Sequence, residues 1–207
     1  GAAGDLVFLG GTALRLGHAL PRFSENLDFD AHSLTAARWK SLLEDTAHAL
    51  ERSGLKPELR CAERGSLLSG ELRFAGFLQA YGLTAAASEK LSIKVEANRP
   101  GYPLEAEPRV IAGYGEMFPA PFAAGGLMFS EKILALLARE MGRDVYDVFF
   151  MAGKKWQPDR RVLTARGLKA TARVAVVRRI TAWAPRRLPR WRGDWSHSCS
   201  NPSRFDW

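Results

Sequence analysis

Residues 6–30 read LVFLGGTALRLGHALPRFSENLDFD, in which two short segments of strand character flank a helical one. The apolar run of residues 6–9 ends at two glycines, a pattern that predicts a buried strand closed by a tight turn. Thr12 is a suitable N-cap for the helix that follows, and this helix must end before Pro21. Strict alternation of polar and apolar residues over 26–30 then predicts a second strand whose polar side chains share one face.

The remainder of the chain alternates between helical and strand patterns. Apolar residues recur at helical spacing over 35–52, and clean alternation over 90–97 predicts a strand that presents Glu96 on its polar face. Further expected elements are short strands or hairpins within 59–83, a loop at 113–126, a helix capped by Ser130, a helix at 144–151 and a basic helix at 164–181. Together they predict an α/β (α+β) fold with a small mixed sheet, followed by a helical C-terminal part.

The net charge of +8 is concentrated at one end of the chain. Residues 160–207 contain twelve Lys or Arg and two Asp, a net charge of +10, whereas residues 1–159 carry −2. A basic end of this kind predicts a polyanionic partner. The two cysteines belong to no CxxC or Cys/His cluster, which disfavours a disulfide framework and a structural zinc site. No signal-peptide core or membrane-spanning run is present, so we expect a cytoplasmic protein with no membrane partner.

Asp28 and Asp30 are the first candidates for chemistry. Because both project from one strand face, about 7 Å apart, they suit Mg²⁺, which takes one or two protein carboxylates. The pair alone is equally typical of a solvated strand face, but Glu96 on another strand offers a third oxygen ligand. A helical cation such as Lys132 neutralises charge on a transferring phosphoryl group. A solvated Lys132 and an ion-paired Asp147 are the alternatives that these residues leave open.

The Gly10-Gly11-Thr12 turn lies where backbone N–H groups and a helix N-terminus can cradle a phosphate. Neither GxGxxG nor GxxxxGK[ST] is present, which argues against a Rossmann dinucleotide site and a Walker-type NTPase. The Asp28-Phe29-Asp30 segment is superficially similar to the opening motif of haloacid-dehalogenase-like phosphatases. That family expects Thr or Val where His32 stands, so we do not favour it.

Four segments in order carry a more specific resemblance: FLGGTALR at 8–15, PRFSENLDFD at 21–30, KVEANR at 94–99, and SEKILALLAR followed by RDVYD within 130–147. Through them, and over residues 6 to about 155, the chain resembles the AbiEii/MenT family. Its members are polymerase-β-like nucleotidyltransferases that act as toxins of bacterial toxin–antitoxin systems. The resemblance implies a minimal nucleotidyltransferase fold that binds an NTP with Mg²⁺ and transfers nucleotides to RNA, with tRNA acceptor ends as the known substrate class. It also implies a separately encoded antitoxin protein.

Carried over residue by residue, the resemblance assigns the triphosphate to Gly10, Gly11 and Thr12, a metal ion to Asp28, the nucleotide phosphates to Lys132, and the acidic position of the last motif to Asp147. The expected sites combine these roles with the strand geometry described above. The expected nucleotide-binding residues are Gly10, Gly11, Thr12, Arg15, Ser24 and Lys132. The expected catalytic residues are Asp28, Asp30, Lys132 and Asp147, and the candidate metal ligands are Asn26, Asp28, Asp30 and Glu96. The corresponding domains are a nucleotidyltransferase core at 1–126, a helical C-terminal part at 127–182 and a basic tail at 183–207 that need not be ordered.

The chain departs from the family pattern at Asn26, where the usual Asp-x-Asp begins. The metal pair is therefore either Asn26/Asp28, with one neutral ligand, or Asp28/Asp30. An amide oxygen is the weaker Mg²⁺ ligand, so the substitution bears directly on activity.

The basic end allows two interpretations, an RNA-binding segment or a solvated extension. Candidate RNA contacts are Arg178, Arg179, Arg186, Arg187 and Trp191, with Trp183 and Trp195 as further stacking platforms. Together with Asn26, this end motivates an alternative function, in which the chain is a catalytically weak RNA-binding relative on the same fold.

Overall fold

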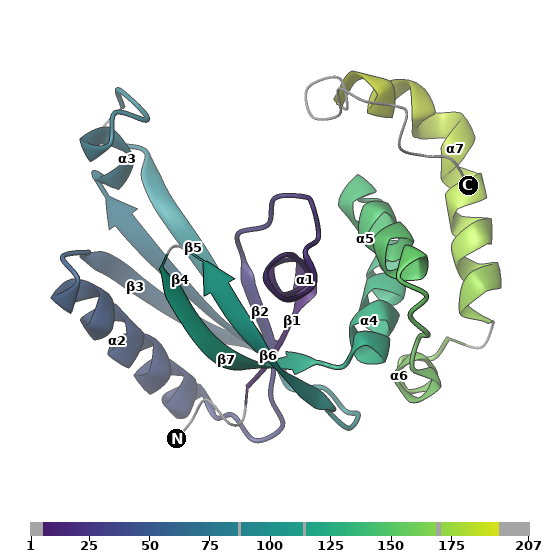
Figure 1. Cartoon of the computed structure of the whole chain (residues 1–207), viewed down its shortest axis with the longest axis horizontal. Helices are drawn as coiled ribbons and strands as arrows, with labels where there is room; N and C mark the ends of the chain where they lie inside the picture. Colours follow the sequence, from purple (N-terminus) through teal and green to yellow (C-terminus); the bar gives the residue numbers. More distant parts are fainter. Residues whose placement is uncertain (1–5, 87, 114, 169–170, 195–207) are drawn as a thin grey trace.

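The computed structural model describes residues 6–86, 88–113, 115–168 and 171–194; the side chains of 184–194 lie outside this description (Figure 1). The strands are β1 (Val7–Leu9), β2 (Leu27–Asp30), β3 (Pro57–Arg64), β4 (Leu67–Ala75), β5 (Lys90–Asn98), β6 (Ala106–Gly113) and β7 (Glu116–Ala123). The helices are α1 (Gly10–His18), α2 (Ala36–Arg52), α3 (Phe77–Ala80), α4 (Gly125–Ala138), α5 (Gly142–Gly153), α6 (Arg160–Ala165) and α7 (Ala172–Asp194). The predicted α/β class, with a mixed sheet followed by helices, is confirmed.

The seven strands form one sheet in the order β3-β4-β5-β2-β1-β7-β6. The sheet is mixed, because β2 pairs with β5 and β1 pairs with β7 in parallel, whereas the other neighbours are antiparallel. The two strands predicted within residues 6–30 lie side by side near its middle, with Leu9 opposite Asp28. Glu96 on β5 is the register partner of Asp28 on the other side. The sheet therefore brings the glycine turn, Asp28 and Glu96 together.

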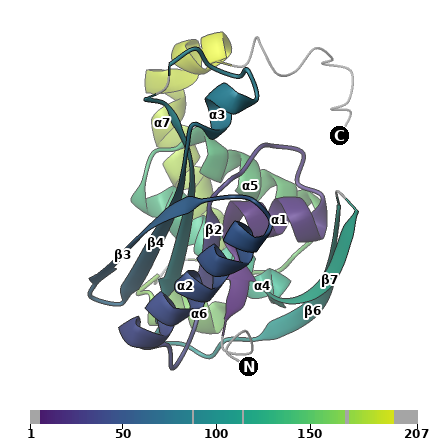
Figure 2. The same ribbon diagram turned by 90° about the vertical axis from the view of Figure 1, so that its left-hand side faces the viewer.

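Helices cover both faces of the sheet. On one face, α2 buries Trp39 and Leu43 against Leu68 and Val95, with Phe29 packed beside them. On the other face, α1 lies between the sheet and the α4–α5 pair (Figure 1), whereas α2 lies in front of the sheet in the view of Figure 2. Asp30 contacts Tyr102, which contacts Glu131 of α4, so Asp30 lies on the helical side of the sheet. The alternating side chains of β2 place Asp28 on the same side, as the alternation predicts. The functional face is thus the interior face between sheet and helices.

The expected loop at 113–126 is wrong, because residues Glu116–Ala123 form β7 and pair with β6. Pro119 and Pro121 hid this strand, since proline lacks the N–H that a central strand donates. β7 meets β1 only at the register pair Phe8–Phe122. Neither proline is a register partner of β1, so neither has to donate a hydrogen bond to that strand.

Two expected helix starts are also wrong. Helix α1 begins at Gly10, and the Thr12 hydroxyl donates to the backbone carbonyl of Asn26 instead of capping. Helix α4 begins at Gly125, which places Ser130 inside the helix. The Ser130 hydroxyl lies 3.0 Å from the carbonyl oxygen of Gly126 and 3.1 Å from that of Asp159, so it fastens α4 to the segment before α6.

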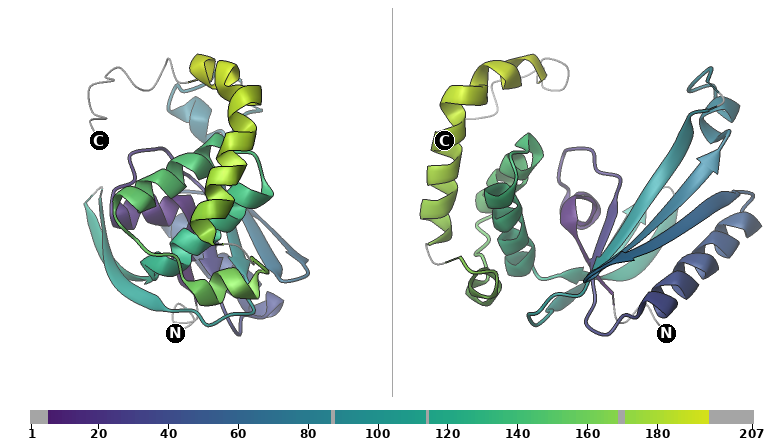
Figure 3. Two further views of the ribbon diagram at one scale, coloured as in Figure 1. Left: turned by 90° about the vertical axis from the view of Figure 1, so that its right-hand side faces the viewer. Right: turned by 180° about the vertical axis from the view of Figure 1, so that it is seen from behind.

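The basic helix expected at 164–181 is two helices, α6 and α7. Gly167 between them has a φ of 79°, a left-handed conformation that interrupts an α-helix and that glycine adopts without a Cβ clash. Helix α7 continues to Asp194 and lies along the outer side of α4 and α5 (Figure 3). Within the part of the chain that the structure describes, no helix has the length and apolar character needed to cross a membrane.

Candidate functional site

The glycine turn is built around the carboxylate of Asp28. Gly10 has a φ of 83°, and a Cβ at this position would lie 2.3 Å from Asp28 Oδ2. A side chain at residue 10 would therefore collide with the carboxylate, quite apart from the strain of the left-handed backbone. The backbone of the turn and the carboxylate form one compact unit at the end of β1.

Asp28 is a shielded carboxylate with no direct partner among the described residues. Burial raises the pKa of Asp28, Lys132 opposes this rise, and Glu96 adds to it. No group in the described part of the chain makes a hydrogen bond or an ion pair with its side chain. Glu96 instead pairs with Lys94, the two charged atoms being 2.6 Å apart. A carboxylate desolvated without a compensating bond is suited to bind a cation.

Asp30 is engaged differently. It is buried, and its Oδ2 lies 3.2 Å from the hydroxyl of Tyr102, which in turn lies 2.7 Å from Glu131 Oε1. Burial, followed by the neighbouring charge of Glu131, raises the pKa of Asp30 to about 7. The Tyr102 hydroxyl can donate only one hydrogen bond. If either Asp30 or Glu131 is protonated, that carboxyl group donates to the hydroxyl oxygen while the hydroxyl donates to the other, so both contacts are hydrogen bonds. Asp30 is therefore held by Tyr102, whereas Asp28 is not.

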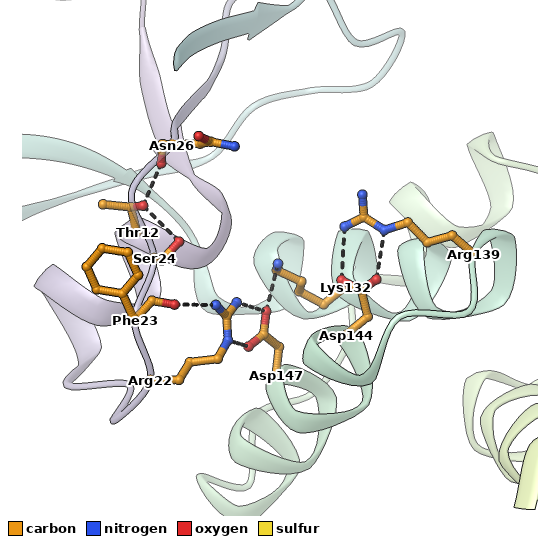
Figure 4. A network of polar contacts seen from close by, with 9 residues as sticks. All are labelled: Thr12, Arg22, Phe23, Ser24, Asn26, Lys132, Arg139, Asp144 and Asp147. Carbon is orange, nitrogen blue, oxygen red and sulfur yellow. Dashed lines mark hydrogen bonds and ion pairs between the residues drawn. The ribbon is translucent and has the colours of Figure 1, made fainter. Parts of the chain in front are cut away.

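The segment between α1 and β2 is anchored to α1 by polar contacts (Figure 4). Thr12 Oγ1 lies 2.9 Å from Ser24 Oγ and donates to the carbonyl of Asn26. Arg15 donates to the carbonyl of Ser24 at 3.2 Å, and its guanidinium lies 5.0 Å from the centre of the Phe23 ring. The expected nucleotide-binding residues thus come together, although Thr12 and Arg15 are bound to the segment itself. In Figure 4 the side-chain amide of Asn26 points away from Thr12.

Asp147 holds two cations at the edge of this site. Its fully buried carboxylate accepts two hydrogen bonds from Arg22, from Nε and Nη2, both at 2.6 Å. Lys132 Nζ lies 2.7 Å from the same carboxylate, so α4, α5 and the segment before β2 meet at one residue (Figure 4). A Cβ at Gly11 would lie 2.7 Å from Arg22 Nη2. The guanidinium therefore lies directly against the glycine turn.

Sequence reasoning did not find Arg22. It follows Pro21 in a segment without periodicity, and its partner lies 125 residues further along the chain. The available signal was the buried acid: Asp147 shares a helix with apolar residues on both sides, and a buried carboxylate requires cationic partners.

A second buried carboxylate repeats the arrangement one turn earlier on α5. Asp144 is fully buried and accepts hydrogen bonds from Arg139 Nε and Nη2 at 2.7 and 3.0 Å (Figure 4). The positive charge of Arg139 also acts on Asp28. Two buried acids thus place cations along the helical side of the site, opposite the shielded Asp28.

The candidate metal ligands are oxygen donors. Asn26, Asp28 and Glu96 supply oxygen atoms, and the compact fit of Gly10 against Asp28 keeps bulk away from that carboxylate. In the described ranges, no group of three or more His, Cys, Asp and Glu side chains is placed to hold a metal ion. A site with one or two carboxylates, completed by nucleotide phosphates and water, is the kind that Mg²⁺ uses, so the residues fit this ion.

The basic end differs from what the residue types suggest. Trp183 is buried in the main core, so the expectation of a stacking platform at this position is wrong. Arg179 lies 3.9 Å from Glu140 and 5.0 Å from the centre of the Trp183 ring, whereas Arg178 is exposed. The side chains of Arg186, Arg187 and Trp191, and residue Trp195 altogether, lie outside the described residues.

Comparison with known proteins identifies a family that covers the whole chain. A family model described as "Nucleotidyl transferase AbiEii toxin, Type IV TA system" matches residues 1–207. Among solved structures, MenT4, a nucleotidyltransferase toxin from Mycobacterium tuberculosis, is 20% identical with a TM-score of 0.52, over 87% of this chain and 56% of that chain. JHP933 from Helicobacter pylori is 21% identical with a TM-score of 0.49, over 87% and 88% of the two chains. The search of curated proteins found no match. At 20% identity, the likeness to MenT4 shows a shared fold.

Proposed function

Because the chain belongs to the AbiEii family of nucleotidyltransferase toxins of type IV toxin–antitoxin systems, we propose that it transfers nucleotides from an NTP to RNA, with the acceptor end of tRNA as substrate. The observation that carries the proposal is the pair of cations, Arg22 and Lys132, that the buried Asp147 holds, with Arg22 directly against the glycine turn. Such a pair stabilises negative charge on a triphosphate without having to reorganise as the reaction proceeds.

The donor nucleotide lies, in this proposal, at the N-terminus of α1. Backbone N–H groups at Gly10 and Gly11 point to its phosphates, favoured by the positive end of the helix dipole. Thr12, Ser24 and Arg15 keep the neighbouring segment in place, and Lys132 and Arg22 neutralise the phosphates. In this proposal the nucleotidyltransferase core of residues 1–126 holds the donor nucleotide, and the helical part of residues 127–182 supplies Lys132 and Asp147.

Asp28 and the amide of Asn26 are the proposed metal ligands, with Glu96 beside them on β5. Asp30 is tied to Tyr102, which favours the Asn26/Asp28 pair over Asp28/Asp30. Mg²⁺ bound there would help to deprotonate the attacking hydroxyl and to stabilise the pyrophosphate leaving group. Asp28 is the one full carboxylate of this pair, so we expect it to be indispensable, and we propose that the buried Asp30 acts mainly by positioning.

Asp147 acts through the cations it holds. Its carboxylate is fully buried behind Arg22 and Lys132 and fixes both cationic groups by charge-assisted hydrogen bonds. It is a positioning residue in this proposal.

The family implies a nucleotide substrate and an antitoxin partner. We place the protein in the cytoplasm, where tRNA and NTPs are available.

The test is incubation of the purified chain with total tRNA, Mg²⁺ and each of the four labelled NTPs in turn. We expect label on tRNA from at least one NTP, and its loss in Asp28→Asn. Replacing Glu44 on the opposite face of the sheet by Gln provides a control with the same loss of charge, and this variant should retain transfer. Label that persists in Asp28→Asn would contradict the assigned role of Asp28.

Asn26 favours a second candidate, the catalytically weak RNA-binding relative. In this alternative the chain would bind tRNA as tightly as an active relative does but would transfer no nucleotide. The reason is that a neutral amide at Asn26 replaces one carboxylate ligand and weakens the binding of Mg²⁺. Asn26→Asp distinguishes the two. If the native chain is inactive and Asn26→Asp transfers nucleotides, the fold serves as an RNA-binding module in this protein.

A further inference from the structure

A basic pocket of about 490 Å³ lies at the C-terminal end of α1, away from the glycine turn. Arg15 and His18 of α1, Arg109 of β6, and Lys154 and Trp156 after α5 all line it. Among the described residues that line it, none is acidic. Helix α1, strand β6 and the segment after α5 therefore bring Arg15, Arg109 and Lys154 to one pocket. Binding of the donor nucleotide at the other end of α1 does not explain this grouping of cations.

The cations of the pocket are incompletely paired. Arg109 makes two long contacts of 3.5 Å, to the carbonyl of Gly17 and to Glu107, and its buried Nε has no hydrogen-bond partner in the described structure. Lys154 lies 5.0 Å from the centre of the Phe150 ring and makes no ion pair with a described residue. A guanidinium has five donors and normally satisfies them in a fixed fork. Arg109 therefore has donor capacity left for an anion.

Compensation of the helix dipole does not account for this charge. The C-terminus of a helix carries roughly half a negative elementary charge. Glu107 adds one negative charge beside Arg109, so three cations leave a clear positive excess. His18 contributes no charge at neutral pH, because burial and the nearby Arg109 and Lys154 lower its pKa to about 4.

We propose that Arg15, Arg109 and Lys154 form a phosphate-binding pocket that holds a backbone phosphate of the acceptor RNA. This inference rests on the proposed function, in which RNA is the acceptor. Helix α1 links the two sites: its first residues face the donor nucleotide, and its last residue lies about 12 Å further along the axis. Arg15 contacts both ends, through Ser24 on one side and the pocket on the other. In this proposal, an RNA strand whose end reaches Asp28 extends along α1 and places a backbone phosphate in the pocket.

The test varies tRNA at saturating NTP, for the native chain and for Arg109→Gln/Lys154→Gln. We expect KM for RNA to rise about tenfold, with kcat and KM for the NTP within about twofold of the native values. The dependence of log K on log salt should become less steep by about 0.7 for each phosphate of a single strand that the variant no longer binds. Arg52→Gln/Lys56→Gln, which removes two cations near α2 on the other face of the sheet, is the matched control and should change neither quantity.

Two further measurements separate folding from binding. Lys154 is exposed, and in the described part of the chain its side chain makes no ion pair and lies over the ring of Phe150. Lys154→Gln alone should therefore retain the thermal unfolding temperature and still raise KM for RNA. Arg109→Lys keeps the charge and should recover most of the RNA affinity. A rise in KM that appears only when the unfolding temperature falls would overturn the proposal.

The remaining outcomes are distinct. Unchanged RNA parameters in the double variant, while the native chain transfers nucleotides, would overturn the pocket and leave the proposed function standing. Unchanged RNA parameters with lost neutralisation by the antitoxin would show that the pocket takes an acidic protein surface, which also overturns the proposal. If the native chain transfers nothing, the proposed function fails, and the anisotropy of labelled tRNA decides the pocket: weaker binding by the double variant supports it, and equal binding overturns it.

Discussion

At the scale of single residues, Asp147 carries the most weight in the candidate site. Asp147→Asn keeps the shape of the side chain and removes the charge that holds Arg22 and Lys132. Since misplacement of a phosphate-binding cation by about 1 Å can cost about 100-fold in rate, we expect nucleotidyl transfer to fall by about that factor. We also expect a loss of stability of about 2 kcal/mol, because two partly shielded cations lose their partner. Initial rates and thermal unfolding measure the two effects.

Asp144→Asn is the matched control, because Asp144 lies on the same helix, is equally buried and holds one arginine in the same bidentate way. We expect a similar loss of stability and a smaller loss of rate, because Arg139 does not touch the glycine turn. Equal losses of rate in the two variants would contradict a specific role of Asp147 in holding the two cations.

His18 gives a prediction for pH dependence. Its pKa is lowered to about 4 by burial and then by Arg109 and Lys154, so the unfolded chain binds a proton more readily than the folded chain. The stabilising contribution of the neutral His18 is therefore fully present above about pH 6.5, and it is lost as the pH falls from 6.5 toward 4. At pH 5 the loss amounts to about 2 kcal/mol relative to neutral pH. His18→Gln should lose less stability between pH 7 and pH 5 in urea unfolding; an unchanged difference would contradict this assignment.

Single residues also show how far sequence reasoning reaches. The alternation over 26–30 placed Asp28 and Asp30 on the correct face, because the period of a strand is fixed by backbone geometry. The choice between Asp28 and Asp30 was open, since it depends on Tyr102, which belongs to another segment. Arg22 was missed for the same reason: its role arises from a contact with Asp147 on α5. Long-range partners of buried charges have no periodic signal.

At the scale of secondary-structure elements, the packing of α1 against the sheet is tight. A Cβ at Gly17 would lie 2.3 Å from Phe122 Cε1, and Phe122 is fully buried on β7. Gly17→Ala should therefore destabilise the fold by about 1–3 kcal/mol through overpacking. Gly153→Ala at the end of α5 is the control, because a Cβ there meets nothing within 4 Å, and it should stabilise by about 0.5 kcal/mol. Thermal unfolding of both variants tests this, and an unaffected Gly17→Ala would show that α1 can shift away from β7.

The elements found correctly from sequence were those whose residues all obey one period, such as α2 and β5. The elements missed were those in which a local rule is relaxed by tertiary context. β7 contains Pro119 and Pro121. A strand paired along both edges excludes proline, but β7 pairs with β1 at a single register position, so the prolines are tolerated. Helix α4 starts with two glycines, and its Ser130 bonds across to Asp159 instead of capping.

At the scale of the whole molecule, the positive charge of the C-terminal end divides into exposed and packed arginines. Arg178 is exposed on α7, whereas Arg179 is engaged by Glu140 and by the ring of the buried Trp183. Under the proposed function, Arg178→Gln should weaken tRNA binding and make its dependence on log salt less steep by about 0.7, with unchanged unfolding temperature. Arg179→Gln should instead lower the unfolding temperature by about 2–4 °C, as expected for a loss of about 1 kcal/mol in a chain of this size. Identical salt dependence in the native chain and in Arg178→Gln would mean that α7 does not contact the RNA, so the positive excess of this end would serve another anionic partner.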